Sequence, residues 1–323
     1  MMRILAVSCL LLCTLSWRDA RVPRAEDEVT YESQGIPLVA TLLLPEGPGP
    51  FPAVVLVHGS GSSDRSNPWT RAYAAALVER GIAVLHPDKR GSGASGGDWR
   101  QASIPDLAED ARAAVRVLQR HPFVDGQRVG LMGFSQGGDV VPLAATGVAE
   151  VAFVIDVSGS VVPLGEQIED ELLRMARRTG LTEQDLAHVR AIHEAALTHA
   201  RTREGWEEYR AALAAARSAG LGGSEVLEGF PVEQDSWVWS FLAKIVDYDP
   251  LPYWRQLEVP ALFLFGGNDE NVDVAKSVDV IQRVLGSSNL SYGLLLFGKN
   301  GHALYREDAL DFIARWIRDG GVD

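Results

Sequence analysis

Among the residues of this chain, the serine in the motif Gly133-Phe-Ser-Gln-Gly137 is the best placed for nucleophilic chemistry. It follows an apolar run of strand length and precedes a segment that can continue as a helix. In that setting the serine occupies a strained turn, and the flanking glycines let neighbouring backbone approach without Cβ clashes. The sequence therefore predicts Ser135 as a nucleophile, with a glycine-rich turn of no catalytic role as the alternative.

A serine hydroxyl needs a general base, and the chain has seven histidines. His302 directly follows the last strand-like run and precedes the final helix, so its loop should lie at the carboxyl edge of a parallel sheet, above the nucleophile. We therefore expect His302 to be the base. The alternative is an ordinary surface-loop histidine.

The base needs an acid that orients it. The buried run 261–265 leads into Gly266-Gly-Asn-Asp269, which places Asp269 at the same sheet edge. Asp269 is the predicted acid. Asp273 and Asp156 remain open as alternatives, and Glu270 is a further neighbour that solvation or helix capping would explain.

Acyl transfer also needs hydrogen-bond donors for the oxyanion. The run 51–57 ends in His58-Gly-Ser-Gly61, where glycine leaves the backbone bare enough for an amide to face a carbonyl oxygen. We expect the N–H groups of Ser60 and Gln136 to form the oxyanion hole.

Apolar runs of strand length alternate with segments of helical spacing along most of the chain. Runs that are buried on both faces and alternate with helices imply a mostly parallel sheet covered on both sides, which is an α/β, doubly wound architecture. A turn at 34–35 predicts an initial hairpin. The strand-like runs are 38–44, 51–57, 82–85, 128–134, 151–157, 261–265 and 292–297, and the helical ones 69–80, 104–120 and 308–318.

The alternation stops between Ser158 and Pro260, where the pattern is almost purely helical. The sequence predicts a helical cap at about 159–250, inserted into a catalytic domain of 26–323. Trp237 and Trp239 alternate around Val238, which predicts that both rings point to one side of an extended segment and line a substrate pocket. Packing of the cap onto the sheet is the alternative for each ring.

Residues 1–25 have the pattern of a signal peptide and leader, with Arg3 ahead of a short apolar run. The run is too short to span a bilayer, so we expect an exported protein, periplasmic or secreted, with no stable membrane span after processing. Both cysteines, Cys9 and Cys13, lie in this segment. The alternatives are a misplaced start codon before a cytosolic enzyme and acylation at Cys9.

Composition narrows the possible partners. The 323 residues are 46% hydrophobic and 23% charged, as in ordinary globular proteins, and the net charge is −13. Such a charge repels phosphate backbones, so we expect no nucleic-acid partner. The insertion histidines His188 and His199 are too far apart along a helix to share a metal, and we expect neither metal nor organic cofactor.

Five motifs together give the chain a family resemblance: His58-Gly-Ser-Gly, Asp88-Lys-Arg-Gly-Ser-Gly93, Gly133-Phe-Ser-Gln-Gly137, Gly266-Gly-Asn-Asp269 and Gly301-His302. In this order they resemble the α/β-hydrolase fold superfamily, in particular exported bacterial serine esterases. The resemblance implies that Asp88 and Arg90 brace loops and that the cap forms the acyl or alcohol pocket.

The predicted function is hydrolysis of small carboxylic esters with an apolar acyl or alcohol group, through a Ser135–His302–Asp269 triad and an acyl-enzyme. A thioesterase or acyltransferase and a peptidase of the same fold remain open as alternatives, as does a non-catalytic binding protein built on a hydrolase fold.

Overall fold

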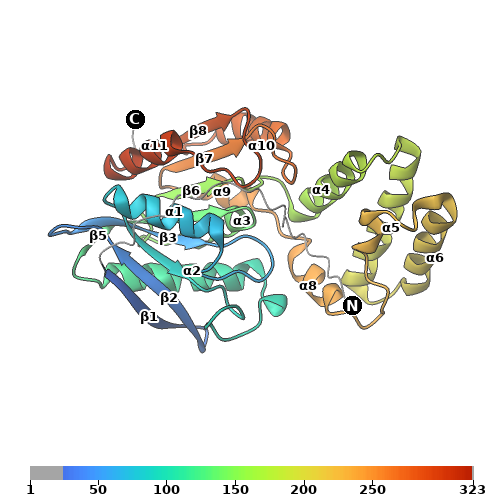
Figure 1. Ribbon diagram of the computed structural model, residues 1–323, viewed down its shortest axis with the longest axis horizontal. Helices are drawn as coiled ribbons and strands as arrows, with labels where there is room; N and C mark the ends of the chain where they lie inside the picture. The colour runs from blue at the N-terminus through green and yellow to red at the C-terminus, as the bar shows by residue number, and fades with distance from the viewer. Residues whose placement is uncertain (1–24, 322–323) are drawn as a thin grey trace.

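The computed structural model describes residues 25–321, which form an eight-stranded sheet with helices on both faces and a helical insertion beside it (Figure 1). The strands are β1 Ala25–Ser33, β2 Ile36–Leu44, β3 Phe51–Val57, β4 Ala83–Pro87, β5 Val124–Phe134, β6 Val154–Val157, β7 Ala261–Gly266 and β8 Tyr292–Phe297. The helices are α1 Pro68–Glu79, α2 Ile104–Gln119, α3 Gly137–Ala145, α4 Leu164–Arg178, α5 Glu183–Thr202, α6 Trp206–Ala216, α7 Glu225–Glu228, α8 Trp237–Ile245, α9 Leu251–Gln256, α10 Val274–Val280 and α11 Glu307–Arg318, with a 3₁₀ turn at Trp99–Gln101 and π-helical segments at Arg217–Leu221 and Ile281–Leu285.

The strand order is β1-β2-β4-β3-β5-β6-β7-β8. β1 pairs with β2, and β2 with β4, in antiparallel fashion, whereas the pairs from β4 to β8 are parallel. The predicted hairpin is present: Gln34 and Gly35 connect its strands with φ of 53° and 76°, the positive values that a tight hairpin turn requires. The predicted α/β, mostly parallel sheet is confirmed.

The run at β3 shows why continuous apolar segments became central strands. Its side chains alternate between the two faces, so each face receives apolar groups. Ala53 and Val55 join a core cluster completed by α2 and α3, whereas Val54 and Leu56 join one completed by α1 and α11. Both faces of the sheet are therefore buried, as the sequence pattern predicted.

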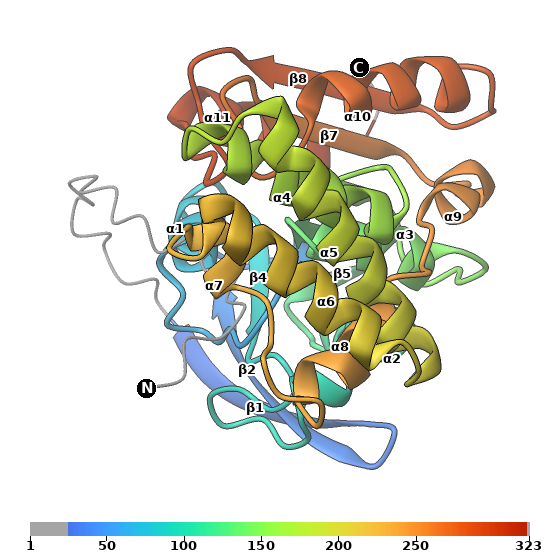
Figure 2. The same cartoon turned by 90° about the vertical axis from the view of Figure 1, so that its right-hand side faces the viewer.

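All the helices between β6 and β7 belong to a segment that leaves the sheet at Val157 and returns at Ala261. Helices α4 to α8 lie to one side of the sheet in Figure 1 and in front of it in Figure 2. They have their own hydrophobic core, which includes Leu186, Tyr209 and Trp239. Helix α5 begins with a reciprocal capping box between Thr182 and Asp185.

The expectation of an extended segment at Trp237 and Trp239 is wrong, because both belong to helix α8. Residues two apart on a helix diverge by about 200°, so the two rings point in different directions. Trp239 is fully buried in the core of the insertion, and its indole N–H donates to the Glu233 carbonyl oxygen at 3.0 Å. Trp237 is half-buried beside Trp99, with ring centroids 5.3 Å apart.

None of the helices within residues 25–321 is long and apolar enough to cross a membrane. The predicted leader and both cysteines lie outside the described residues.

Candidate active site

Ser135 lies in the turn between β5 and α3, where its backbone adopts a φ of 52°. A positive φ is uncommon for a residue with a side chain and marks a locally strained position. The turn is fixed on both sides: the Ser135 N–H donates to the Val157 carbonyl at 3.0 Å, and the Ser135 carbonyl accepts from the Gly138 N–H at 2.7 Å. The sharp turn predicted from the glycine spacing is therefore present.

Both glycines of the motif are required, because a side chain at either position would clash with neighbouring backbone atoms. A Cβ on Gly133 would lie 2.3 Å from the Gly137 carbonyl carbon, and one on Gly137 would lie 2.2 Å from the Val57 carbonyl oxygen. Real Cβ atoms do not approach backbone that closely. Strand β5 and helix α3 can therefore meet at Ser135 only because these positions carry no side chain.

His302 and Asp269 form a hydrogen-bonded pair. The His302 Nδ1 is 2.9 Å from Asp269 Oδ2 and 3.1 Å from Oδ1, and Asp269 is only 8% exposed. A carboxylate can only accept, so Nδ1 carries a proton, and this contact selects the neutral tautomer whose lone pair is on Nε2. Asp269 Oδ1 also accepts the backbone N–H groups of Asn271 and Val272 at 2.8 and 2.9 Å, which fix the carboxylate.

Close backbone packing brings the loops after β7 and β8 together. A Cβ on Gly266 would lie 2.3 Å from the Gly301 carbonyl oxygen, and the Asn268 N–H donates to the Asn300 carbonyl at 2.8 Å. Both loops lie at the carboxyl edge of the sheet, as does the turn that carries Ser135. Within the described part of the chain, no hydrogen bond joins the Ser135 hydroxyl to His302; catalytic contacts are often long in unliganded enzymes.

Helix α1 holds the histidine loop from the other side. The Trp69 indole N–H and the Tyr73 hydroxyl both donate to the Leu304 carbonyl oxygen, at 2.9 and 3.0 Å. The Trp69 ring also lies beside the imidazole of His302, with centroids 5.6 Å apart. The orientation of His302 therefore depends on α1 as well as on Asp269.

The loop after β3 passes directly beside Ser135. A Cβ on Gly59 would lie 3.2 Å from the Ser135 Cβ and 3.8 Å from its hydroxyl oxygen. Ser60 follows on this loop, and Gln136 follows Ser135 in the chain. Neither the Ser60 N–H nor the Gln136 N–H has an acceptor among residues 25–321.

The nearby histidine His58 and the alternative acids on the loop after β7 have structural contacts. His58 Nε2 donates to the Pro87 carbonyl at 2.7 Å, and burial lowers the pKa of His58 to about 4, so the ring is neutral. Asp273 caps α10 and pairs with Arg174, and Glu270 pairs with Arg178. These contacts leave Asp269 as the carboxylate that His302 meets.

Asp156, the remaining alternative acid, lies at the base of the turn rather than beside the histidine. It is fully buried in β6, and its Oδ1 accepts the Gly159 N–H at 2.9 Å. A Cβ on Gly138 would lie 2.3 Å from the same oxygen. Burial raises the pKa of Asp156 to about 8, so it is protonated at neutral pH.

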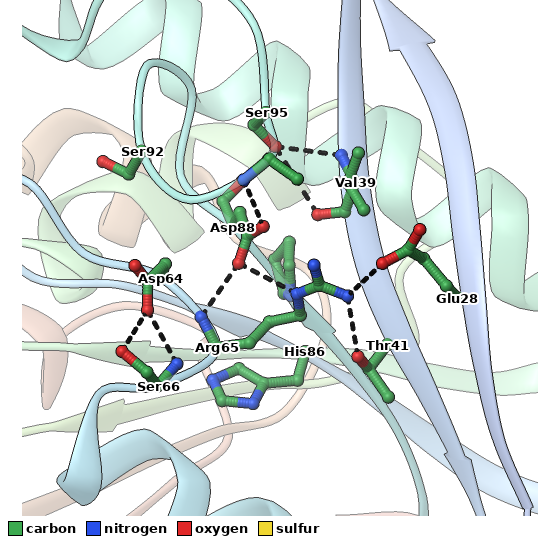
Figure 3. A network of polar contacts seen from close by, with 12 residues as sticks. Glu28, Val39, Thr41, Asp64, Arg65, Ser66, His86, Asp88, Ser92 and Ser95 are labelled. Atoms are coloured by element: carbon green, nitrogen blue, oxygen red, sulfur yellow. Dashed lines mark hydrogen bonds and ion pairs between the residues drawn. The ribbon is translucent and has the colours of Figure 1, made fainter.

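Asp88 organises the loops on the β4 side of the site (Figure 3). Its Oδ1 accepts the backbone N–H and the Nε–H of Arg65, both at 2.9 Å, and its Oδ2 accepts the Ala94 N–H at 2.8 Å. Arg90 forms two 2.6 Å contacts with the carboxylate of Asp110. These contacts agree with the bracing roles that the resemblance implied for Asp88 and Arg90.

Two further residues beside the site were missed by the sequence reasoning. Glu171 on α4 interacts electrostatically with His302 and Asp269, and burial raises its pKa to about 7. Lys89 extends towards the loop after β3 and contacts Gln136. Glu171 belongs to no sequence motif, so only tertiary packing shows that it lies beside the site. Lys89 belongs to the Asp88–Gly93 motif, which directly follows a strand, and these two features could have identified it from the sequence.

Helix α4 joins the insertion to the loop that carries the acid. Gln167 donates to the Asn271 carbonyl at 3.0 Å, and Arg174 pairs with Asp273 at 3.1 Å. These residues and Glu171 are spaced by four and three positions, so they share one face of the helix. That face therefore lies on the acid loop, with Glu171 between its two contacts.

No group of three or more His, Cys, Asp or Glu residues within the described range could hold a metal ion.

Comparison with known proteins places the chain in a family. Residues 34–303 match the X-Pro dipeptidyl-peptidase (S15) family, a span that includes all three residues of the candidate triad. The chain belongs to that family. It has the α/β-hydrolase fold, which confirms the resemblance inferred from the motifs.

Individual relatives extend this comparison. Esterase EstD of Thermotoga maritima is 25% identical over 306 residues, 93% of this chain, which spans just under two thirds (66%) of EstD's own length. Acyl-coenzyme A thioesterase 1 of Rattus norvegicus is 29% identical over 134 residues, 40% of this chain and 29% of that protein. The solved structure of the Pyrococcus furiosus esterase Pf2001 superposes with a TM-score of 0.60 at 17% identity, covering 95% of each chain, which shows a shared fold.

Proposed function

We propose that this protein is a hydrolase that cleaves carboxylic esters of small molecules through an acyl-enzyme formed on Ser135. The observation that carries the proposal is the arrangement at the sheet edge, where Ser135 sits in a strained turn and the Asp269–His302 pair lies on neighbouring loops. The similarity to the protein named esterase EstD supports an ester substrate.

The proposed mechanism assigns one role to each residue. His302 Nε2 removes the hydroxyl proton of Ser135, and the serine oxygen attacks the acyl carbon. The N–H groups of Ser60 and Gln136 stabilise the tetrahedral oxyanion. His302 then protonates the leaving alcohol and activates the water that releases the acid, while Asp269 holds the imidazole in the tautomer with a free Nε2.

The helical insertion is proposed to cover the site and to form the acyl or alcohol pocket, with Trp237 as a lining residue. Its half-buried ring supports this role, whereas the complete burial of Trp239 in the insertion core favours a packing role for that ring. Export of the chain belongs to the same proposal and rests on the sequence of residues 1–25 alone.

A peptidase is the second candidate, because the matched family is described as X-Pro dipeptidyl-peptidases. Matched substrates separate the two functions: a p-nitrophenyl ester and a p-nitroanilide of the same acyl group, and an X-Pro p-nitroanilide. We expect ester cleavage with a far higher kcat/KM, and no turnover by Ser135→Ala. Faster cleavage of the X-Pro anilide than of the esters would contradict the proposal and support a peptidase.

A further inference from the structure

Lys89 is a cation with no carboxylate partner, beside the proposed oxyanion hole. It follows β4 at the carboxyl edge of the sheet, and its Nζ donates to the Gly59 carbonyl at 2.7 Å and to Gln136 Oε1 at 3.3 Å. Both acceptors are neutral, and no ion pair of Lys89 occurs within residues 25–321. An ammonium that is partly withdrawn from water and has no counter-ion is costly, so its retention calls for a compensating role.

The contact with Gly59 has a geometric consequence. The Gly59 carbonyl and the Ser60 N–H belong to one peptide group, which is planar and trans, so the two bonds point in opposite directions. An ammonium that fixes the carbonyl therefore also fixes the direction of the Ser60 N–H. It further polarises the peptide group, which strengthens that N–H as a donor.

The second contact reaches the other proposed donor. Gln136 supplies its backbone N–H to the oxyanion hole, while its side chain accepts from the same ammonium that holds Gly59. One Lys89 side chain thus links the loop after β3 to the turn after β5. Gly59 already packs within contact distance of Ser135, so a small shift of either segment would misplace a donor.

The Lys89 backbone is itself held in place. Its N–H donates to the Ser63 carbonyl at 3.1 Å, and its carbonyl accepts the Ser92 N–H at 2.9 Å. Its neighbour Asp88 is the centre of the network in Figure 3. The side chain therefore extends from a fixed backbone.

We infer that Lys89 is a positioning residue of the oxyanion hole: its ammonium group orients the Gly59–Ser60 peptide and Gln136 so that both backbone N–H groups face the substrate carbonyl oxygen. The inference rests on the proposed function. It goes further by naming a charged group outside the triad on which transition-state stabilisation depends.

The charge of Lys89 should make this effect depend on pH. Burial lowers the pKa of Lys89 to about 7, opposed by the carboxylate of Asp110 on α2. The other charged or titratable groups around it are His58 after β3, which is neutral, Asp88, which is bound to Arg65, and Arg90, which is paired with Asp110. Tyr31 on β1 lines the same cavity and stays neutral, because burial raises its pKa. As pH rises through this range, Lys89 loses its charge and donor strength, and kcat should fall.

The test compares wild type, Lys89→Met and Lys89→Arg, with Lys244→Met on the exposed face of α8 as a matched control. For Lys89→Met we expect kcat for an ester to fall by about 10- to 100-fold with KM changed by less than about threefold, because the loss is confined to the transition state. Lys244→Met should behave as wild type. A Lys89→Met enzyme with wild-type kcat would overturn the inference.

The pH profile separates positioning from a merely structural role. Wild-type kcat should decline several-fold between about pH 7 and 9, Lys89→Met should lack this decline, and Lys89→Arg should keep its activity because guanidinium stays charged. The same decline in Lys89→Arg as in wild type would overturn the inference. Since that comparison needs no neutral variant, it decides the matter even when Lys89→Met does not fold.

Failure of the inference is distinguishable from failure of the proposed function. A wild-type enzyme that neither turns over esters nor acquires an organophosphate on Ser135 would refute both. Wild-type turnover that responds to Ser135→Ala but not to Lys89→Met would refute only the role of Lys89.

Discussion

At the scale of single residues, the site depends on which carboxylate meets the histidine. The chain offers several acids close to the same sheet edge, and the structure separates them by their contacts. Asp269 receives two backbone N–H groups and the imidazole, whereas Asp273 caps a helix. The two aspartates therefore form a natural pair of test variants.

Asp269→Asn should reduce kcat for ester hydrolysis by about 10³- to 10⁴-fold, because the amide can favour the wrong imidazole tautomer. Asp273→Asn should keep kcat within a few-fold of wild type and change the free energy of unfolding little, because the asparagine Oδ1 can still accept the Lys276 N–H at the helix cap. Steady-state kinetics and urea unfolding of both variants provide the measurement. Equal losses of kcat in both variants would contradict the assignment of Asp269.

The buried carboxyl group of Asp156 should make the free energy of unfolding of the protein depend on pH. Its pKa is raised by burial from 3.8 to about 8, so between these values the folded protein holds a proton that the unfolded chain releases. The free energy of unfolding should therefore fall as pH rises through this window, by about 1.4 kcal/mol per pH unit for one proton. Asp156→Asn keeps an oxygen for the Gly159 N–H and should show a weaker dependence. Urea unfolding at pH 5 and pH 7.5 tests this, and identical pH slopes in both proteins would count against it.

At the scale of elements, the junction of β5 and α3 is the most demanding part of the fold. A Cβ on Gly137 would lie 2.2 Å from the Val57 carbonyl oxygen, whereas a Cβ on Gly223, in the insertion, would have no atom within 4 Å. The same substitution can therefore be compared at a crowded and an open position.

Gly137→Ala should lower the free energy of unfolding by about 1–3 kcal/mol and kcat by about 100-fold, because the turn must shift to admit the methyl group. Gly223→Ala should leave kcat unchanged and alter stability by less than about 0.5 kcal/mol. Denaturant unfolding and ester kinetics measure both effects. Full activity in Gly137→Ala would show that the turn tolerates a Cβ and would remove the steric argument.

Helix α8 offers a second matched pair. Trp239→Ala removes a ring that is fully buried in the insertion core and should cost about 3–5 kcal/mol of unfolding free energy. Trp237→Ala should cost much less, because that ring is half-buried, and should instead raise KM for esters with large apolar groups. Unfolding curves and an ester chain-length series would measure this, and a larger stability loss in Trp237→Ala would reverse the two assignments.

At the scale of the whole molecule, much of the fold could be predicted because strands that are buried on both faces are recognisable as continuous apolar runs in the sequence. Runs such as Phe51–Val57 are apolar throughout, since alternate side chains enter different core clusters. The turn at Ser135 was equally visible, because backbone crowding permits only glycine at two fixed positions. The His302 loop was predictable from its place after the last strand.

Other features depend on contacts that sequence spacing does not record. Alternation at Trp237 and Trp239 suggested an extended segment, but packing of Trp239 and Leu242, three residues apart, into the insertion core selects a helix. Glu171 becomes notable only because α4 lies on the acid loop. Lys89 acquires its contacts from the sheet order, which places β3 between β4 and β5.

The proposed mechanism requires a covalent intermediate at Ser135. Mixing the purified protein with a chromogenic ester, quenching in acid within the first turnover and mapping the peptides by mass spectrometry tests it directly. We predict that the acyl mass appears on the peptide that contains Ser135 and is absent from that peptide in Ser135→Ala. Ester turnover without an acylated peptide, or with acylation of a different residue, would contradict the account.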